Sequence, residues 1–540
     1  MTTSTNKNSR LVVIAAIGFA VFIWLNWFPP GGMDEQLTVE TTTVISKSEA
    51  SVTAKDFIAS QYDVNELNTM VLFNSYQNAN GYFLREKLFD LYKSTWKSSI
   101  PIDYYEVLVQ ETGTDLKFKV YLRMDDGEVY AWELLNPSEY KGTSKVEETN
   151  NNNILLKLGY EAEDYISTND NVGVDYTHRQ VIGKATLHLK LKQQGDLITG
   201  FVPAFELPES YTTWKDRQDS LGAGWSLFSQ LLWFGLAIAA IVYMAIYRKT
   251  MSFGRGILLT LAFLIPYLIH NVNMYPGFML IAAGSSGSAI SIMLFSQFIM
   301  MLMGVTVYLS FVAGEGMWRK LDWHLWPSSK EANYGSIMMS SMRKGYLICL
   351  IVLGFQSLLF FIAGKLFDVW ATSDPLMSTH NLLEPALFPL LAWSAAISEE
   401  AVFRLFGIVF FVYMFRLLGN RLFRMTGSVF FQRTIVHLVP AVVLSNMIWA
   451  LGHTGYSIYP VYTRFIEVSL LGFIFAYAFL RYGLLTAIFA HATMDIVIMG
   501  LQIMMGNPNH ALLGFGYMLM PFLVAWLISF LWRWRMTGAP

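Results

Sequence analysis

Long apolar runs alternate with short polar segments over most of the chain, and basic residues cluster at the ends of these runs. Most runs approach or exceed the roughly 20 residues that an α-helix needs to cross a bilayer. The pattern therefore predicts an all-α polytopic membrane bundle. The ten expected spans are 11–28, 225–247, 256–270, 289–312, 345–366, 384–416, 435–453, 465–480, 484–504 and 512–531.

Residues 31–221 interrupt this pattern and predict a folded α+β domain. Apolar and polar residues alternate on both sides of Asp126-Gly127 and of Gln194-Gly195, which indicates two β-hairpins. Amphipathic helices are expected near 50–61 and 83–94, ahead of the hairpins. The polar run at 150–153 predicts a linker, so the domain could consist of two subdomains.

Composition supports a membrane protein. Of 540 residues, 54% are hydrophobic and 14% are charged, and the mean hydropathy is +0.39. This is too apolar for a soluble globular chain of this length. The net charge of -2 is uninformative, because the charges are segregated. The single cysteine, Cys349, excludes a disulfide framework and a cysteine-based zinc site.

The basic clusters predict the orientation in the membrane. Lys7 and Arg10 precede the first span, and no small-residue cleavage site follows it, which favours an uncleaved signal-anchor helix at 11–28. Lys and Arg prefer the cytoplasmic side, so both termini are expected in the cytoplasm and residues 31–221 outside. The expected location is a bacterial cell membrane, with 225–247 as the second transmembrane helix.

The span at 384–416 contains three charged residues near its middle. Glu400 and Arg404 are four residues apart on one helical face and predict a buried ion pair, whereas Glu399 is left as a free carboxylate. Charges at this depth are costly unless they are paired or line a polar cavity. A purely structural network that orients helices is the alternative. The second, unpaired acid favours a function, because a free carboxylate can take a proton from water.

Two later spans also carry polar groups. His453 shares a face with Asn446 and Trp449, and His491 lies one turn before Asp495. We expect these groups to meet Glu399 in one polar cavity. The depth of His491 in the membrane is difficult to reconcile with that of Glu399. His491 is only about 10 Å along its span when counted from 484, so this span must begin deeper in the membrane or tilt.

These polar sites form three short motifs in a fixed order. They are E-E-x-x-x-R at Glu399, Glu400 and Arg404, W-x-x-x-H at Trp449 and His453, and H-x-x-x-D at His491 and Asp495. The set resembles the CPBP family (CAAX protease and bacteriocin-processing), also called the Abi or type II CAAX prenyl endopeptidase family. The resemblance covers about 256–535, eight spans, and implies that these form the family's eight-helix protease-like core. Residues 11–247 look like an addition to it.

The resemblance implies an intramembrane endopeptidase. Glu399 and His453 would activate water, and His491 and Asp495 would stabilise the oxyanion. Glu400 and Arg404, together with Asn446 and Trp449, would support the site. Trp449 replaces the family's phenylalanine, which looks conservative. Asp495 stands where asparagine is usual, and an ionised aspartate cannot donate a hydrogen bond.

This interpretation requires no cofactor, but a zinc site is an alternative. Two histidines and two carboxylates are zinc ligands in other proteins, although the H-E-x-x-H signature is absent. The expected partners are a membrane-anchored protein or peptide substrate, the lipid bilayer and an extracytoplasmic ligand of residues 31–221. No nucleic acid is expected.

Two other functions stay open. A rhomboid-like serine protease could use Ser286, which stands in Gly284-Ser285-Ser286-Gly287, although this leaves Glu399 unexplained. A non-catalytic membrane protein is the other class, such as a bacteriocin immunity factor, a sensor scaffold or a proton-coupled carrier, because intramembrane carboxylates also serve proton transfer. The absence of an evident inverted repeat argues against the carrier.

Overall fold

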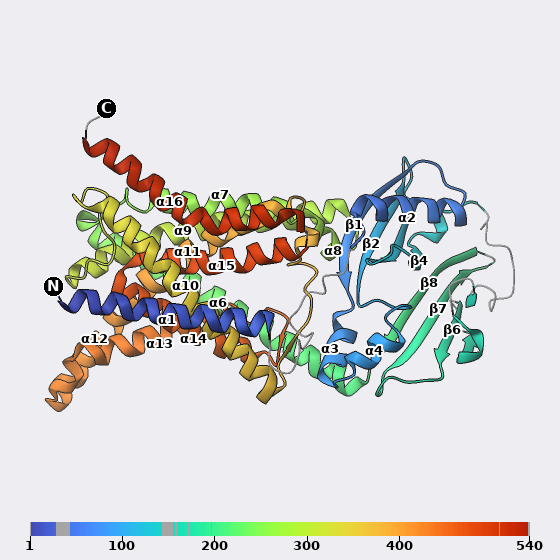
Figure 1. Cartoon of the computed structure of the whole chain (residues 1–540), viewed down its shortest axis with the longest axis horizontal. Coiled ribbons are helices and arrows are strands. Elements are labelled where there is room, and N and C mark those ends of the chain that lie inside the picture. The colour runs from blue at the N-terminus through green and yellow to red at the C-terminus, as the bar shows by residue number, and fades with distance from the viewer. Residues whose placement is uncertain are drawn as a thin grey trace.

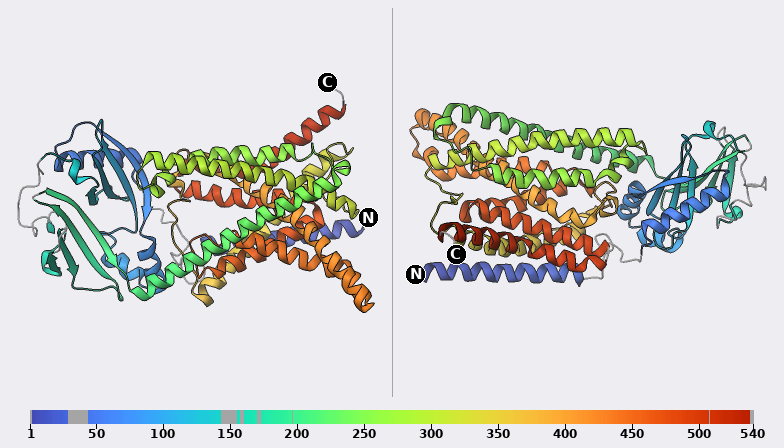
Figure 2. Two further views of the ribbon diagram at one scale, coloured as in Figure 1. Left: turned by 180° about the vertical axis from the view of Figure 1, so that it is seen from behind. Right: turned by 90° about the horizontal axis from the view of Figure 1, so that it is seen from above.

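The protein consists of a long helical bundle with a mixed helix and sheet domain at one end (Figure 1). The computed structural model describes residues 2–28, 44–142, 155–156, 160–169, 173–195, 197–506 and 508–537. Both ends of the chain lie at the end of the bundle that faces away from the sheet (Figures 1 and 2). The predicted domain start at 31 and the predicted linker at 150–153 lie outside the described residues.

The bundle consists of long apolar helices. Its helices are α1 (Thr2–Trp27), α6 (Glu209–Tyr247), α7 (Ile257–Asn273), α8 (Tyr275–Ile281), α9 (Ser286–Lys320), α10 (Tyr334–Phe367), α11 (Leu391–Glu399), η6 (Glu400–Gly407), α12 (Ile408–Thr426), α13 (Thr434–Leu451), α14 (Tyr462–Tyr482), α15 (Leu484–Gly506) and α16 (Ala511–Thr537). Within the described residues, nine helices are long and apolar enough to cross a membrane, or ten if the bent pair α7–α8 counts as one span. This is consistent with the predicted polytopic bundle.

Two helices differ from the predicted pattern. Helix α7 covers the predicted third span, and it is followed by a second short helix, α8, at an angle of 55° to it. Helix α6 begins at Glu209, well before the predicted span, so the expected boundary between 221 and 225 falls inside one continuous helix. The chain therefore leaves the sheet domain without a flexible hinge at that point.

The domain contains a single antiparallel sheet. Its strands are β1 (Leu67–Ser75), β2 (Asp103–Glu111), β3 (Lys117–Arg123), β4 (Val129–Leu134), β5 (Tyr165–Asn169), β6 (Gly173–His178), β7 (Thr186–Gln194) and β8 (Leu197–Glu206), in the order β1-β2-β3-β4-β8-β7-β6-β5. Both predicted hairpins are present as β3–β4 and β7–β8. Strand β4 pairs with β8, and so joins the two halves, through Trp132 with Phe201 and Glu133 with Gly200. The expected pair of subdomains is thus joined into one sheet.

Helices cover one face of the sheet. Helix α2 (Lys47–Gln61) begins with a capping box between Ser46 and Glu49. The second predicted helix is divided into α3 (Gln77–Arg85) and α4 (Phe89–Thr95). Ile58, Phe118 and Phe201 are completely buried between helices and sheet. The domain therefore has its own apolar core.

Direct contacts fix the domain to the bundle. Asn381 is completely buried and caps the outer edge of β1: its Oδ1 accepts from the Phe73 amide at 2.8 Å, and its Nδ2 donates to the Phe73 carbonyl at 2.7 Å. Leu72 packs with Phe278 and Met279 of α8. Because Asn381 belongs to the segment that leads into α11, the sheet is tied to the helix that ends at Glu399.

Candidate active site

Three charged side chains lie where α11 passes into a π-helix. Glu399 is the last residue of α11, and η6 carries Glu400 and Arg404. A π-helix pairs backbone groups five residues apart and is rare in proteins. Two side chains from other elements donate to carbonyls of this segment. Ser445 Oγ donates to the Phe403 carbonyl at 2.6 Å, and Trp318 Nε1 donates to the Leu405 carbonyl at 2.7 Å.

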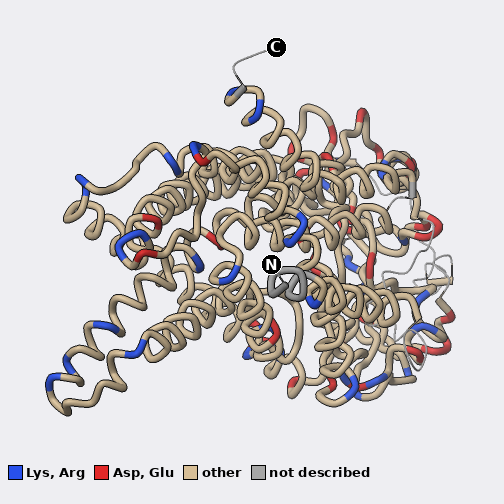
Figure 3. Tube along the Cα trace, turned by 60° about the vertical axis from the view of Figure 1, so that its left-hand side comes forward, with Lys and Arg blue, Asp and Glu red and all other residues tan. Residues whose placement is uncertain are grey.

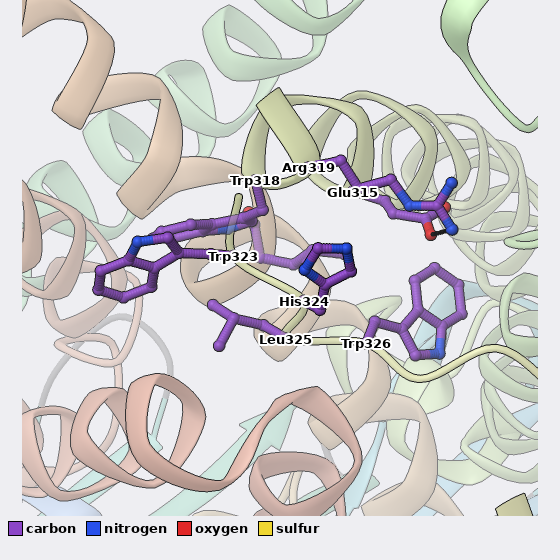
Figure 4. A pocket seen from close by; sticks show the side chains of 8 residues that line it. Glu315, Trp318, Arg319, Trp323, His324, Leu325 and Trp326 are labelled. Carbon is purple, nitrogen blue, oxygen red and sulfur yellow. Dashed lines mark hydrogen bonds and ion pairs between the residues drawn. The ribbon is translucent and has the colours of Figure 1, made fainter. Parts of the chain in front are cut away.

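Trp318 belongs to an aromatic cluster beside the π-helix (Figure 4). Its ring stacks on Trp323 with 5.3 Å between the ring centroids. Nearby, the buried Glu315 forms ion pairs with Arg255 and with Arg319. The enclosed space is only about 10 Å³, which is room for one water molecule. This pocket thus supports the π-helix and is too small for a substrate.

The predicted ion pair between Glu400 and Arg404 is present and completely buried. Arg404 Nη1 lies 3.2 Å from Glu400 Oε1. The guanidinium also lies over the Trp449 ring, 3.9 Å from its centroid. Arg404 thereby links η6 to α13 through a cation–π contact.

Trp449 lies in the last turn of α13, and His453 follows two residues after the helix ends at Leu451. Trp449 Nε1 donates to Glu399 Oε2, so the indole holds the carboxylate directly. The replacement of the family's phenylalanine is therefore not conservative, because a phenyl ring has no N–H. His453 Nδ1 lies 2.9 Å from the Trp449 carbonyl. A carbonyl only accepts, so Nδ1 carries the proton and Nε2 of the neutral ring is an acceptor.

His491 of α15 lies beside two carboxylates, those of Glu400 on η6 and Glu399 on α11. Its Nδ1 lies 2.9 Å from Glu400 Oε1, while its Nε2 lies 3.7 Å from Glu399 Oε2 and 3.6 Å from Asp495 Oδ2. The ring stacks on Phe475 of α14 with 4.7 Å between centroids. Glu400 thus orients His491 in addition to pairing with Arg404, which the motif spacing did not indicate.

The predicted residues converge on Glu399. His453 Nε2 lies 3.8 Å from Glu399 Oε1, and His491 Nε2 approaches the other oxygen of the same carboxylate. The side chains of Glu399 and His453 are 17% and 19% exposed, so the site is reachable from outside the protein. Asn446 is buried on α13, and its Nδ2 has no hydrogen-bond partner in the described part of the chain.

The depth of His491 is explained by where α15 begins. Leu484 is completely buried, and its amide donates to the Leu325 carbonyl at 2.8 Å. The loop after α9 therefore lies over the start of α15, and the helix starts inside the protein.

Sequence reasoning missed a second layer of polar groups on the outer side of the site. The Tyr456 ring stacks on His453 with 6.3 Å between centroids, and the Arg464 guanidinium lies 4.9 Å from the Tyr456 centroid. Arg464 Nη1 donates to Glu467 Oε2 at 2.6 Å, and Gln356 Nε2 donates to Glu467 Oε1 at 2.8 Å. Tyr456 follows His453 by three residues, but that spacing in a loop carries no signal.

The donor types at the site are those that bind zinc, but their placement does not fit a zinc ion. Zinc takes its ligands at about 2.0–2.2 Å in a tetrahedron. Among the described residues, no three His, Cys, Asp or Glu side chains are grouped so that they could hold a metal ion. One oxygen of Glu399 is already engaged by Trp449.

Ser286 lies at the first turn of α9, next to the sheet domain. The residue before it, Ser285, caps the helix by accepting from the Ser288 amide. Among the residues that the structure describes, no hydrogen bond joins Ser286 to a histidine. The arrangement is that of a helix start and does not form a serine and histidine pair.

Residues 381–497 match the family model described as Type II CAAX prenyl endopeptidase Rce1-like. The match runs from the segment before α11 into α15 and includes all three motifs, which confirms the family resemblance. No curated protein and no solved structure matches the chain. The match supports a CAAX protease-like membrane enzyme. It is shorter than the expected region of 256–535: α7–α10 and α16 lie outside it, as do α1, the sheet domain and α6.

Proposed function

We propose that this protein is an intramembrane endopeptidase, which hydrolyses peptide bonds of membrane-associated proteins or peptides with water activated by Glu399 and His453. One observation carries the proposal: the Glu399 carboxylate lies within 3.8 Å of the Nε2 atoms of both His453 and His491. Glu399 ends α11, His453 lies in the turn after α13 and His491 lies in α15, so their meeting is not a consequence of local sequence spacing.

Water activation follows from the arrangement of acceptors. Glu399 Oε1 and His453 Nε2 are 3.8 Å apart, too far for a direct hydrogen bond, and both can accept. A water between them would donate one hydrogen to each and direct its lone pair toward a substrate carbonyl. Glu399 would take one proton as the oxygen attacks the carbonyl carbon, and would later pass it to the leaving amine.

The oxyanion needs donors on the opposite side of the carbonyl. His491 Nδ1 is engaged by Glu400, so Nε2 of the protonated ring is free to donate to the developing charge. Asp495 would add a second donor only when it is protonated; when ionised, it would orient His491. Removal of one oxyanion donor typically costs about 10²–10³ in kcat.

The polar neighbours would hold this geometry without touching substrate. Glu400 and Arg404 fix His491 and the Trp449 ring, and Trp449 fixes Glu399. Asn446 packs against Gly472, where an added Cβ would lie 2.7 Å from Asn446 Oδ1. These are positioning residues.

For the substrate, we propose a membrane-anchored protein or peptide whose segment outside the membrane contacts the sheet domain. A cleft of about 350 Å³ lies where β1–β3 meet α8, within the range of ligand sites. Asn74, Gln77 and the Lys119–Glu106 pair line one side, and Leu280 and Ile281 the other. The side-chain amides, the two charged groups and the apolar wall of this cleft could contact the backbone and the side chains of a polypeptide. Ile281→Trp should raise KM and leave kcat unchanged.

We further propose that the sheet domain is extracytoplasmic, with both termini in the cytoplasm of a bacterial cell. The termini and the domain lie at opposite ends of the bundle. Lys141 in the domain and Gln432 at the other end of the bundle are both exposed, so each can be replaced by cysteine as a reporter of its side of the membrane. The native Cys349 is buried. A membrane-impermeant thiol reagent added to intact cells should label Lys141→Cys and not Gln432→Cys.

The activity test compares new amino termini in membrane proteins from cells that contain either the wild type or Glu399→Gln. The wild type should generate termini that Glu399→Gln and His453→Ala do not, with unchanged thermal unfolding. Glu384→Gln makes the same substitution at an exposed acid on the same stretch and should be fully active. An active Glu399→Gln would refute the assigned base. Stoichiometric zinc, lost together with activity on chelation, would refute the metal-free scheme.

A further inference from the structure

The hairpin formed by the end of α12 and the start of α13, residues 414–435, extends away from the bundle at the end that carries both termini (Figures 1 and 2). We call it the basic hairpin. It carries Arg416, Arg421, Arg424 and Arg433 and no acidic residue. The chain contains no Asp or Glu from 401 to 466. In Figure 3 the two projecting arms accordingly carry the blue of Lys and Arg and no red of Asp or Glu.

All four arginines are exposed. None forms an ion pair with a carboxylate in the part of the chain that the structure describes. The Arg433 guanidinium lies 6.0 Å from the centroid of the Phe430 ring. Four like charges on one projecting element repel one another unless an anion lies among them. The hairpin therefore has a charge that the protein itself does not neutralise.

Large apolar side chains are exposed between the arginines. Leu417, Met425 and Val429 are 71%, 73% and 67% exposed, respectively. This combination distinguishes the hairpin from a solvated basic loop, which would carry polar residues at these positions. Apolar groups that enter the acyl boundary, with arginines that reach back to phosphates, are typical of an element lying in the membrane interface.

We infer that the basic hairpin is a binding site for anionic phospholipid headgroups at the surface of the bilayer. A cluster of four or more basic residues beside a membrane helix attracts anionic lipid, and the attraction per residue corresponds to about fivefold in affinity. The exposed leucine, methionine and valine side chains would add acyl-chain contacts, so the site should recognise the intact lipid.

The position of the hairpin couples this site to the chemistry. One arm continues from the π-helix with Arg404, and the other leads to Trp449 and His453. The arms meet closely at Gly419, where an added Cβ would lie 2.4 Å from His437 Cε1 and 2.5 Å from the Phe431 carbonyl oxygen. Headgroup binding at the tip would thus hold the two arms in one relative orientation. The binding inference itself does not depend on the proposed proteolysis.

The test uses the full-length protein in neutral maltoside micelles, with an environment-sensitive dye at Gln432→Cys. Gln432 is exposed, and Cys349 is buried and should not react. Dioleoyl phosphatidylglycerol should shift the dye emission at a concentration at least tenfold below that of dioleoyl phosphatidylcholine. Arg421→Gln with Arg424→Gln should weaken the response to phosphatidylglycerol by about 25-fold, at fivefold for each arginine.

Matched variants separate charge from folding. Arg421→Lys with Arg424→Lys keeps both charges and should keep the affinity, and Lys190→Gln with Arg217→Gln removes two exposed charges from the other end of the molecule and should change nothing. Soluble glycerol phosphate should not bind at the same concentrations. Equal responses to the two lipids, or an unchanged response in the glutamine variant, would overturn the inference.

Discussion

Replacing Trp449 by phenylalanine removes the indole N–H that donates to Glu399 and leaves an aromatic ring in place under Arg404. Trp449 is only 4% exposed, so its bond to Glu399 forms inside the protein. We expect Glu399 to rotate more freely and to spend less time in line with His453. The fold should persist, since the Glu400–Arg404 pair and the stacking of Phe475 on His491 are untouched.

The size of the effect follows from the type of bond. Hydrogen bonds to charged groups contribute about 1.5–3 kcal/mol. If that contribution is lost entirely from the transition state, kcat falls by about 10- to 150-fold. Because Trp449 positions the base and does not contact substrate, KM should stay within about twofold.

Trp393→Phe provides the matched control. Trp393 Nε1 is buried and has no hydrogen-bond partner among the described residues, so the same substitution removes a similar volume without loss of a bond. Steady-state kinetics on one membrane-anchored peptide would compare the two variants. If Trp449→Phe is as active as Trp393→Phe, the indole does not hold the base, and the reasoning is wrong.

Three further predictions concern two neighbours of this carboxylate and the contact between the sheet and the bundle. Glu400→Gln leaves Arg404 buried without its counter-ion and should lower the free energy of unfolding by about 3–5 kcal/mol, whereas Glu400→Gln with Arg404→Met should recover most of it; thermal unfolding in detergent measures both, and a double variant no more stable than the single one would contradict this. Asp495→Asn should stay active because an amide can donate to the oxyanion, while Asp495→Leu should lose about 100-fold in kcat; equal losses would mean that the carboxylate itself is required. Asn381→Ala removes both hydrogen bonds to Phe73 and should lower the free energy of local opening of β1 by about 2–4 kcal/mol, so that its amides exchange faster. Unchanged exchange would show that β1 is held by other contacts.

The sequence predicted the membrane bundle, the two hairpins and the Glu400–Arg404 pair, because each depends on periodicity or on spacing within one helix. It also led to the correct expectation that His453 and His491 meet Glu399. Nothing in it indicated the π-helix, since η6 is stabilised by donors from Ser445 and Trp318, distant in the chain. A substitution that looked conservative, Trp449, proved to hold the candidate base.

What the sequence by itself determined is which side chains carry charge inside apolar helices, because burying a charge is too costly to occur by chance. Tertiary structure alone decided the partner of each group: Glu400 contacts His491 as well as Arg404, and Glu399 is held by an indole. The physical reason is that such contacts join helices whose depth and rotation are set by packing. For example, α15 begins inside the protein, where the Leu484 amide donates to the Leu325 carbonyl, and this brings His491 to the level of Glu399.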